Sequence, residues 1–229
     1  MRKLIPGLVA AMLAASSCLA SDLTETETRW LKGVWPVVVF AKASKLPLDV
    51  IVQPQAAPGA APLASGFIDG RCKLVLSMRG NAEAQATLDR IEPELLDAAL
   101  ELMAAHELGH CQRYLEGSWL SLPAGFAPSE PAGLSDDLRE AYVTMRSVRR
   151  EEGYADLVGL AWTQQRRPQQ YGRLHHWLVT ERSRDLIPGT HHDTLAWLET
   201  ARDGSVLAHA SIFAGAAAQW GKGLAATAP

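Results

Sequence analysis

The most constraining feature of the sequence is a His-Glu-x-x-His motif, formed by His106, Glu107 and His110. It lies in the segment Pro93–Leu115, which has apolar residues at helical spacing and a proline that fits a first helical position. Residues four apart lie on one face of a helix, so both imidazoles can reach one metal ion. Glu107 is then placed to reach a water molecule on that ion. The motif therefore predicts a metal-binding helix.

A glycine, Gly109, lies between the two histidines of this motif. Glycine inside a helix costs up to about 1 kcal/mol relative to alanine, so it does not help the helix to form. One interpretation is that the missing side chain lets another backbone or a substrate approach closely. The other is that the glycine is incidental, and the sequence leaves both open.

The motif lacks one ligand, because a catalytic zinc site uses three protein ligands and one open position. A later helix, predicted from about Asp136 to Trp162, carries Glu152 and Asp156 four residues apart and so on one face. Glu152 can supply the third ligand, and Asp156 can accept the N–H of a ligating histidine and orient its ring. The adjacent Glu151 has no such partner four residues on, which favours Glu152.

Together the two segments resemble the gluzincin group of zinc metallopeptidases. The form Glu-x-x-Ala-Asp is similar to the branch that contains the CAAX-prenyl and heat-shock membrane proteases and their periplasmic relatives. The resemblance implies a zincin-like fold in which His106, His110 and Glu152 bind one zinc ion. It further implies that Glu107 is the general base and that Asp156 is the hydrogen-bond partner of a ligating histidine, His106 in the first place.

The resemblance implies a peptide or protein substrate and hydrolysis of a peptide bond. The formal net charge of −3 offers no argument for nucleic acid as a partner. An alternative is a zinc-binding envelope protein without turnover, acting as a binding or chaperone-like factor. Glu107 favours the enzyme, because loss of the base is the simplest sign of an inactive site. A third possibility is a helical domain in which the motif arose by chance.

A peptidase also needs a hydrogen-bond donor for the oxyanion of the transition state, and the sequence does not identify it. The candidates are downstream histidines and tyrosines: Tyr142, Tyr154, Tyr171, His175, His176, His191 and His192. Cys111 is not expected to bind the metal, because on a helix it points about 100° away from its neighbour His110.

A small sheet is expected before the motif helix. The apolar, β-branched segments Val34–Phe40 and Leu48–Gln53 predict strands, and residues 55–65 predict a loop. Residues Gly66–Met78 predict a hairpin around an Asp-Gly turn. Its second strand, Cys72–Met78, precedes the motif helix, where zincins usually place the edge strand that pairs with an extended substrate.

Helices are expected after the motif. Beyond the Asp136 helix, they are predicted at about Pro168–Arg184, from near His192, and at Ser205–Trp220. The loop Gly117–Ser135 is either a flap beside the site or a plain connector. A sheet followed by helices predicts an α+β class, with residues 21–229 as a single metallopeptidase-like domain.

The first twenty residues are basic, then apolar, then small, an order typical of a signal peptide cleaved near Ala20. The mature protein is therefore expected to be periplasmic or secreted, and an uncleaved anchor or a lipoprotein remains the alternative. No other segment is long and apolar enough to span a membrane. Cleavage leaves two cysteines, Cys72 and Cys111, which form either a disulfide or two buried thiols.

Overall fold

The computed structural model of the chain describes residues 22–122 and 133–226. Over these residues it is an α+β structure with seven α-helices and a three-stranded sheet, which confirms the predicted class. The helices are α1 (Glu25–Ala43), α2 (Ala82–Asp89), α3 (Leu96–Leu115), α4 (Asp136–Arg166), α5 (Tyr171–Ser183), α6 (Leu195–Thr200) and α7 (Ile212–Ala226). The strands are β1 (Leu48–Val52), β2 (Leu63–Ile68) and β3 (Arg71–Leu76).

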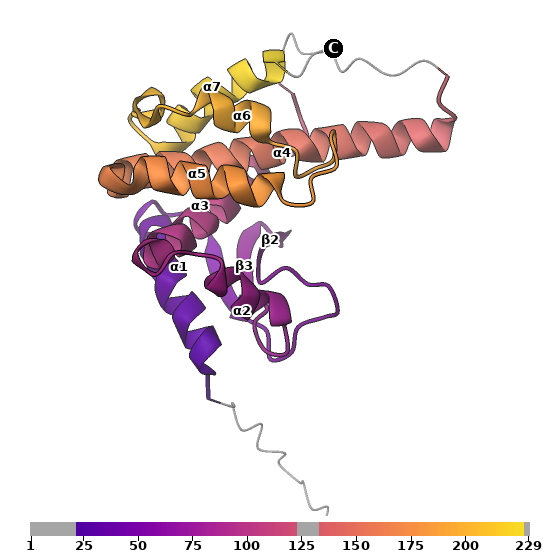
Figure 1. Cartoon of the computed structure of the whole chain (residues 1–229). Coiled ribbons are helices and arrows are strands. Elements are labelled where there is room, and N and C mark those ends of the chain that lie inside the picture. Colours follow the sequence, from indigo (N-terminus) through magenta and orange to yellow (C-terminus); the bar gives the residue numbers. More distant parts are fainter. Residues whose placement is uncertain (1–21, 123–132, 227–229) are drawn as a thin grey trace, which may run out of the picture.

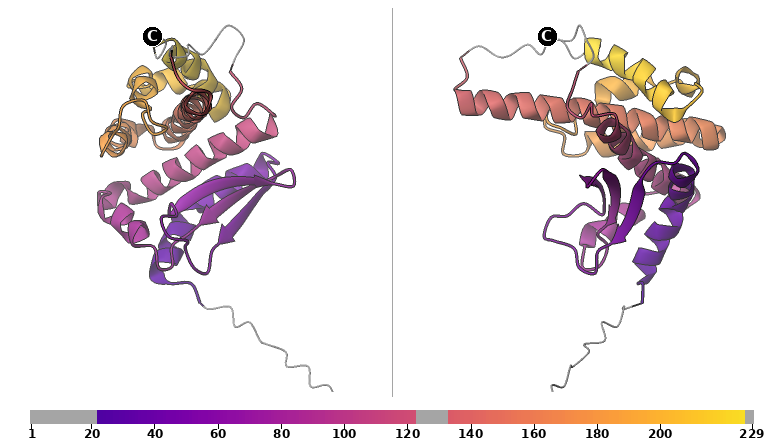
Figure 2. Two further views of the ribbon diagram at one scale, coloured as in Figure 1. Left: turned by 90° about the vertical axis from the view of Figure 1, so that its right-hand side faces the viewer. Right: turned by 180° about the vertical axis from the view of Figure 1, so that it is seen from behind.

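The elements form three layers, with α3 in the middle (Figures 1 and 2). The sheet, α1 and α2 lie on one side of α3, and α4 to α7 lie on the other. The motif helix is therefore buried between the two outer layers, and it begins after a 3-10 turn at Pro93–Leu95, close to its predicted start.

The sheet has the strand order β1-β3-β2. The predicted hairpin is confirmed: β2 and β3 are antiparallel around Asp69 and Gly70, which both have positive φ, as a tight hairpin turn requires. The predicted edge position of Cys72–Met78 is wrong, because β3 pairs with β1 on one side and with β2 on the other. The edge strand beside α3 is β2, which begins at Leu63 inside the predicted loop.

The segment Val34–Phe40 is helical and not a strand, because it belongs to α1. Thr24 and Glu27 form a capping box that starts this helix: the Glu27 N–H donates to the Thr24 hydroxyl, and the Thr24 N–H donates to the Glu27 carboxylate. The buried apolar residues then recur at helical spacing: Trp30, Val34, Val37 and Ala41. The spacing and the cap outweigh the β-branched composition. Helix α2 was not predicted at all.

A disulfide joins Cys72 of β3 to Cys111 of α3, with the two Cα atoms 5.6 Å apart. The two bonded cysteines are 39 residues apart in the sequence. A cross-link over a loop of this length stabilises a fold by about 4 kcal/mol in the chain-entropy model. The bond therefore fixes the motif helix to the central strand of the sheet.

The helices after the motif lie near their predicted positions. α4 runs to Arg166, a 3-10 turn at Pro168–Gln170 leads into α5, and α6 begins at Leu195. The predicted helix Ser205–Trp220 is divided into a 3-10 turn at Gly204–Leu207 and α7.

Two predictions concern the parts of the chain outside the described residues. The signal peptide and its cleavage near Ala20 lie wholly outside them, and the Gly117–Ser135 loop lies partly outside. Within the described part of the chain, no helix combines the length and the hydropathy that a membrane crossing needs.

Candidate metal site

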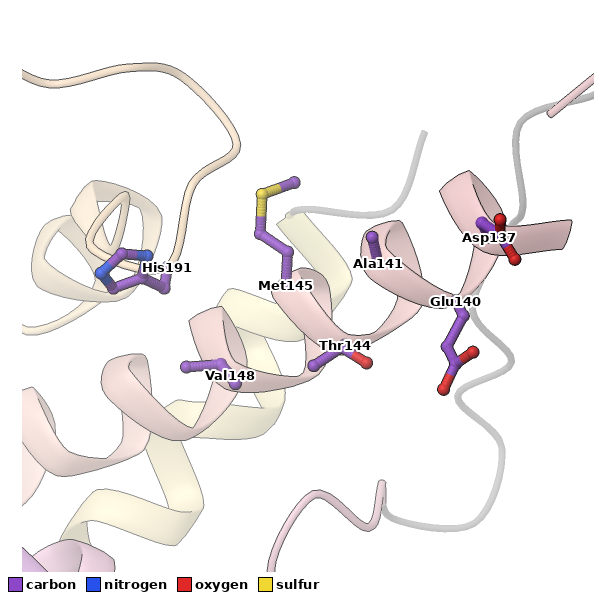
Figure 3. Close-up of a pocket in the computed structure, with 7 residues that line it drawn as sticks. All are labelled: Asp137, Glu140, Ala141, Thr144, Met145, Val148 and His191. Atoms are coloured by element: carbon purple, nitrogen blue, oxygen red, sulfur yellow. The ribbon is translucent and has the colours of Figure 1, made fainter. Parts of the chain in front are cut away.

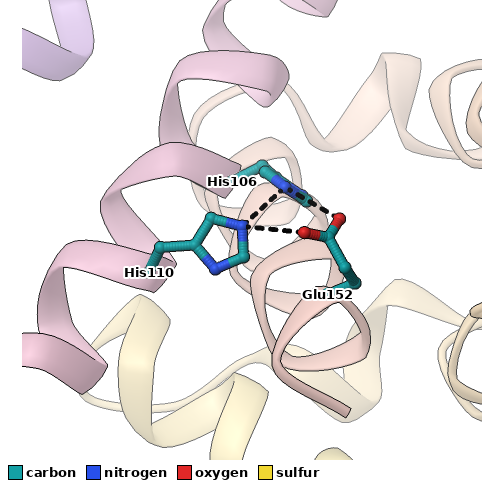
Figure 4. Close-up of side chains that lie close together, drawn as sticks. All are labelled: His106, His110 and Glu152. Carbon is teal, nitrogen blue, oxygen red and sulfur yellow. Dashed lines mark hydrogen bonds and ion pairs between the residues drawn. The ribbon is translucent and has the colours of Figure 1, made fainter. Parts of the chain in front are cut away.

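Three side chains from two helices converge at the crossing of α3 and α4 (Figure 4). The Nε2 atoms of His106 and His110 lie 3.1 Å apart. The Glu152 carboxylate oxygens lie 3.5 Å from Nε2 of His106 and 3.3 Å from Nε2 of His110. All three ligand atoms lie within 4.8 Å of one another, so the group could hold a metal ion.

The chemistry of these donors fits a cation at their centre. Nδ1 of His106 faces a carboxylate, and Nδ1 of His110 is buried and has no hydrogen-bond partner among the described residues. When each Nδ1 carries the ring proton, both Nε2 lone pairs point toward the Glu152 carboxylate and toward each other. Such an arrangement is repulsive unless a proton or a metal ion lies between the donors. Two imidazoles and one carboxylate are also a ligand set that suits zinc.

Asp156 is completely buried one helical turn beyond Glu152. Its Oδ1 lies 2.8 Å from Nδ1 of His106, so the structure brings this predicted pair together. It also accepts hydrogen bonds from Thr194 Oγ1 at 2.6 Å and from Arg182 at 2.6 and 2.9 Å. These contacts hold the carboxylate in place, and the carboxylate in turn orients the His106 ring.

Both carboxylates are ionised in this setting. Burial raises the pKa of Glu152, but its hydrogen bond with His110 and the charges of His106 and Arg182 outweigh burial and hold the pKa at about 2. Burial also raises the pKa of Asp156, but Arg182 and His106 hold it well below its usual range. Glu152 is therefore available as an anionic ligand at neutral pH.

Arg182 of α5 is a site residue that the sequence did not reveal. Its guanidinium bonds Asp156 and lies 3.2 Å from a Glu152 oxygen. Burial lowers the pKa of Arg182, but the two carboxylates raise it further, so the side chain stays charged. One signal could have found it: Arg182 follows the buried Leu174 and Leu178 at four-residue steps, which places a charge on an otherwise apolar helix face.

The neighbouring Glu151 belongs to a different contact. Its carboxylate accepts hydrogen bonds from Arg113 at 2.8 and 2.9 Å and from the Leu120 N–H at 3.0 Å. It points away from the histidines, so Glu152 and not Glu151 completes the cluster.

Glycines allow α3 and α4 to cross closely enough for this geometry. A Cβ added at Gly109 would lie 2.9 Å from the Cα of Ala155, and one at Gly159 would lie 2.9 Å from the carbonyl oxygen of Leu102. Of the two interpretations of Gly109, close approach of another backbone is therefore the one that the structure supports.

The cluster opens into a cavity of about 630 Å³. One wall is the segment Leu63–Ser65 of β2, and another is the partly buried face of α3 from Met103 through Glu107 to Tyr114. Glu107, the predicted base, thus lines the same space as the histidines. The site is accessible to a molecule considerably larger than water.

Of the seven candidates for an oxyanion donor, His192 alone lines this cavity. Tyr171 donates to the Ala201 carbonyl, and Nε2 of His175 lies 2.8 Å from the Leu198 carbonyl oxygen. Tyr154 packs edge-on against Trp220, away from the cluster. His191, Tyr142 and His176 do not line the cavity either.

A second cavity, of about 850 Å³, lies along the N-terminal half of α4 (Figure 3). Its lining combines apolar and acidic side chains of this helix with His191. It contains none of the predicted metal ligands and neither Glu107 nor Asp156, and Val148 is the one side chain that lines both cavities.

Comparison with known proteins found no match among family models, curated proteins or solved structures. The likeness to gluzincins therefore stands on the two short motifs.

Proposed function

We propose that this protein is an exported, zinc-dependent metallopeptidase that hydrolyses peptide bonds. One observation carries the proposal: His106, His110 and Glu152 converge at a buried helix crossing, at the base of a cavity that Glu107 also lines. Ligand atoms from two helices meet within 4.8 Å, and neither helix alone would bring them together.

His106, His110 and Glu152 would hold the ion. Zinc, when bound, supplies a Lewis acid that polarises the scissile carbonyl and acidifies a water molecule. Glu107 follows His106 directly on α3, and its side chain reaches the open cavity. In the proposed reaction, its carboxylate accepts the proton of the attacking water and delivers it to the leaving amine.

The surrounding residues position this machinery. Asp156 keeps the proton of His106 on Nδ1, which leaves the Nε2 lone pair for the ion. Arg182 balances the charge of two carboxylates, the partly buried Glu152 and the fully buried Asp156. His192 is the candidate donor for the oxyanion, and burial together with the charge of Arg182 lowers its pKa, which favours a neutral ring.

The outer edge of β2 is suited to bind the substrate backbone. The Ser77 N–H donates to the Pro62 carbonyl, and bonds to β3 alternate from there along an antiparallel pair. The N–H and C=O groups of Leu63, Ser65 and Phe67 therefore point away from β3. No other described strand pairs with this edge, so an extended peptide could add to it beside the metal cluster.

Export is supported by two features of different kinds. The basic, apolar and small residues that follow one another in residues 1–20 are typical of a signal peptide. The Cys72–Cys111 disulfide fits an oxidising compartment outside the cytoplasm. The intact mass of protein recovered from the cell envelope tests this part of the proposal, because cleavage near Ala20 removes a defined number of residues.

The central experiment combines metal analysis with cleavage of a peptide library. We expect one zinc ion per chain, cleavage that a chelator abolishes and zinc restores, and no cleavage by the Glu107→Gln variant. That variant should keep its zinc and lose at least about 100-fold in kcat, since a general base contributes about that much or more. Undiminished cleavage by Glu107→Gln would exclude the mechanism. Zinc binding without any cleavage by the unmodified protein would favour the alternative of a non-catalytic binding factor.

A further inference from the structure

One end of the cavity is built from stacked aromatic rings. Tyr114 of α3 and Trp119 of the following loop stack with centroids 4.2 Å apart, and Phe67 of β2 stacks with Tyr114 at a centroid distance of 5.2 Å. The Trp119 ring also meets the His110 ring edge-on, with centroids 5.4 Å apart. We call these three side chains the aromatic shelf.

The shelf adjoins the metal cluster and faces the same open space. Tyr114 lies one helical turn beyond His110 on α3, and both Tyr114 and Trp119 line the cavity. Both are only partly buried, which leaves aromatic surface available to a bound molecule. A side chain bound there would belong to a residue close to the bond that is cleaved.

The loop that carries Trp119 is held from both sides. The Arg113 guanidinium donates to the Ser118 hydroxyl at 2.8 Å and to the Ser121 carbonyl at 2.7 Å, and Glu151 accepts from the Leu120 N–H. Arg113 and Glu151 are themselves joined by two buried hydrogen bonds. Trp119 is therefore fixed before any ligand binds, which lowers the entropic cost of binding.

The part of the cavity beside the start of β2, where the Asn81 amide of the α2 cap donates to the Ala60 carbonyl, has a different chemistry. It is lined by charged side chains that pair with one another: Arg90 with Glu83 and Glu181, and Arg184 with Glu181. An uncharged ring bound beside these charged groups would displace their solvent at a cost in free energy. At the shelf the same ring gains stacking contacts. The two ends thus favour different parts of a substrate.

We infer that the aromatic shelf binds an aromatic side chain of the substrate, on the N-terminal side of the cleaved bond. The inference rests on the proposed peptidase function. The direction follows from β2, whose C-terminal residue pair Phe67–Ile68 lies at the shelf. A peptide that pairs antiparallel to β2 places its N-terminal residues at the shelf and its C-terminal residues at the charged end.

The test uses pairs of otherwise identical peptides with Phe or Ala at each position N-terminal to the cleavage site of the zinc-loaded protein. We expect kcat/KM to be about ten-fold higher for Phe at one position, the size expected for stacking and burial of one ring. Trp119→Ala should remove this preference and Trp119→Phe should keep most of it. The matched control is Trp35→Ala, which removes a tryptophan 51% exposed on α1 and should leave the preference unchanged.

A purely structural role for Trp119 makes a different prediction. Trp119→Ala would then slow the cleavage of Phe and Ala peptides by the same factor, and that result would overturn the inference. A cleavage profile of the unmodified protein without any aromatic preference would overturn it as well.

Failure of the proposed function can be separated from failure of the shelf. Binding of the same peptides to the zinc-loaded protein can be measured by fluorescence anisotropy without any turnover. If no peptide is cleaved but Phe peptides bind about ten-fold more tightly than Ala peptides, and Trp119→Ala abolishes the difference, the peptidase proposal fails and the shelf stands. If binding shows no preference for Phe, the shelf is refuted whether or not cleavage occurs.

Discussion

The two halves of helix α4 differ in almost every physical respect, although they belong to one continuous helix. The N-terminal part of α4 extends past the other helices (Figure 1), and residues 136–149 remain at least partly exposed, with Leu138 60% exposed. Residues 150–163 pack against α3 and α7, and Leu157 has no exposed surface. Glu152 lies at the start of the buried half.

The difference shows what a charge requires in each half. In the exposed half, Asp136 forms only a solvated pair with Arg139, which contributes little to stability. In the buried half, Glu151 is paired with Arg113, and Asp156 with His106, Arg182 and Thr194. A buried charge without such partners would strongly destabilise the fold. Each acid in the buried half therefore needs the partners that pair with it.

The largest expected effect comes from removing one of these buried charges. Asp156→Asn leaves the largely buried Arg182 without its main counter-charge and should cost about 3 kcal/mol of unfolding free energy. Asp136→Asn in the exposed half should cause no measurable change. Urea unfolding of both variants with a chelator present measures the difference without a contribution from metal. A loss below about 1 kcal/mol for Asp156→Asn would contradict the expected difference between charges in the buried and exposed halves of α4.

A second comparison uses one apolar substitution in both halves. Leu157→Ala should cost about 2–5 kcal/mol, because it leaves a cavity in the core. Leu138→Ala should stay within about 0.5 kcal/mol, because the side chain is already in contact with solvent. Similar losses of unfolding free energy in the two variants would show that Leu138 is buried in solution, and not exposed.

A smaller effect is expected where the buried half crosses α3. A Cβ at position 109 meets the backbone of α4, so Gly109→Ala should cost about 1–3 kcal/mol despite the better helix propensity of alanine. It should also weaken zinc binding, because the crossing sets the distance between the histidines and Glu152. Gly172→Ala in α5 is the control: its Cβ meets nothing within 4 Å, so this variant should gain up to about 1 kcal/mol. Thermal unfolding and zinc titration of the two variants would distinguish them, and equal behaviour would argue against close packing at Gly109.

Features that depend on local spacing were predictable from the sequence. The motif helix and the Glu152–Asp156 pair follow from helical spacing, and the hairpin follows from the turn preference of its Asp-Gly pair. In Val34–Phe40 two local patterns conflict: the β-branched composition predicts a strand, whereas the spacing of Trp30, Val34 and Val37 predicts the helix that forms. The helical cap at Thr24 is a second local signal that favours the helix.

Features that depend on contacts between distant segments were not predictable in this way. The strand order places β3 in the centre of the sheet, and no property of β3 alone distinguishes a central strand from an edge strand here. Arg182 lies 26 residues from Asp156 and reaches it only because α5 packs beside α4. The aromatic shelf likewise joins a strand, a helix and a loop.

The disulfide gives helix α3 a mechanical role that its motif alone does not suggest. His110 and Cys111 are neighbours in the sequence, but one points toward α4 and the other is bonded to β3. With an ion bound at the proposed site, α3 would be tied to the layer above by coordination and to the layer below by a covalent bond. Reductant and chelator would then each release a different layer, and because the two links start from neighbouring residues of α3, their costs in unfolding free energy should not simply add.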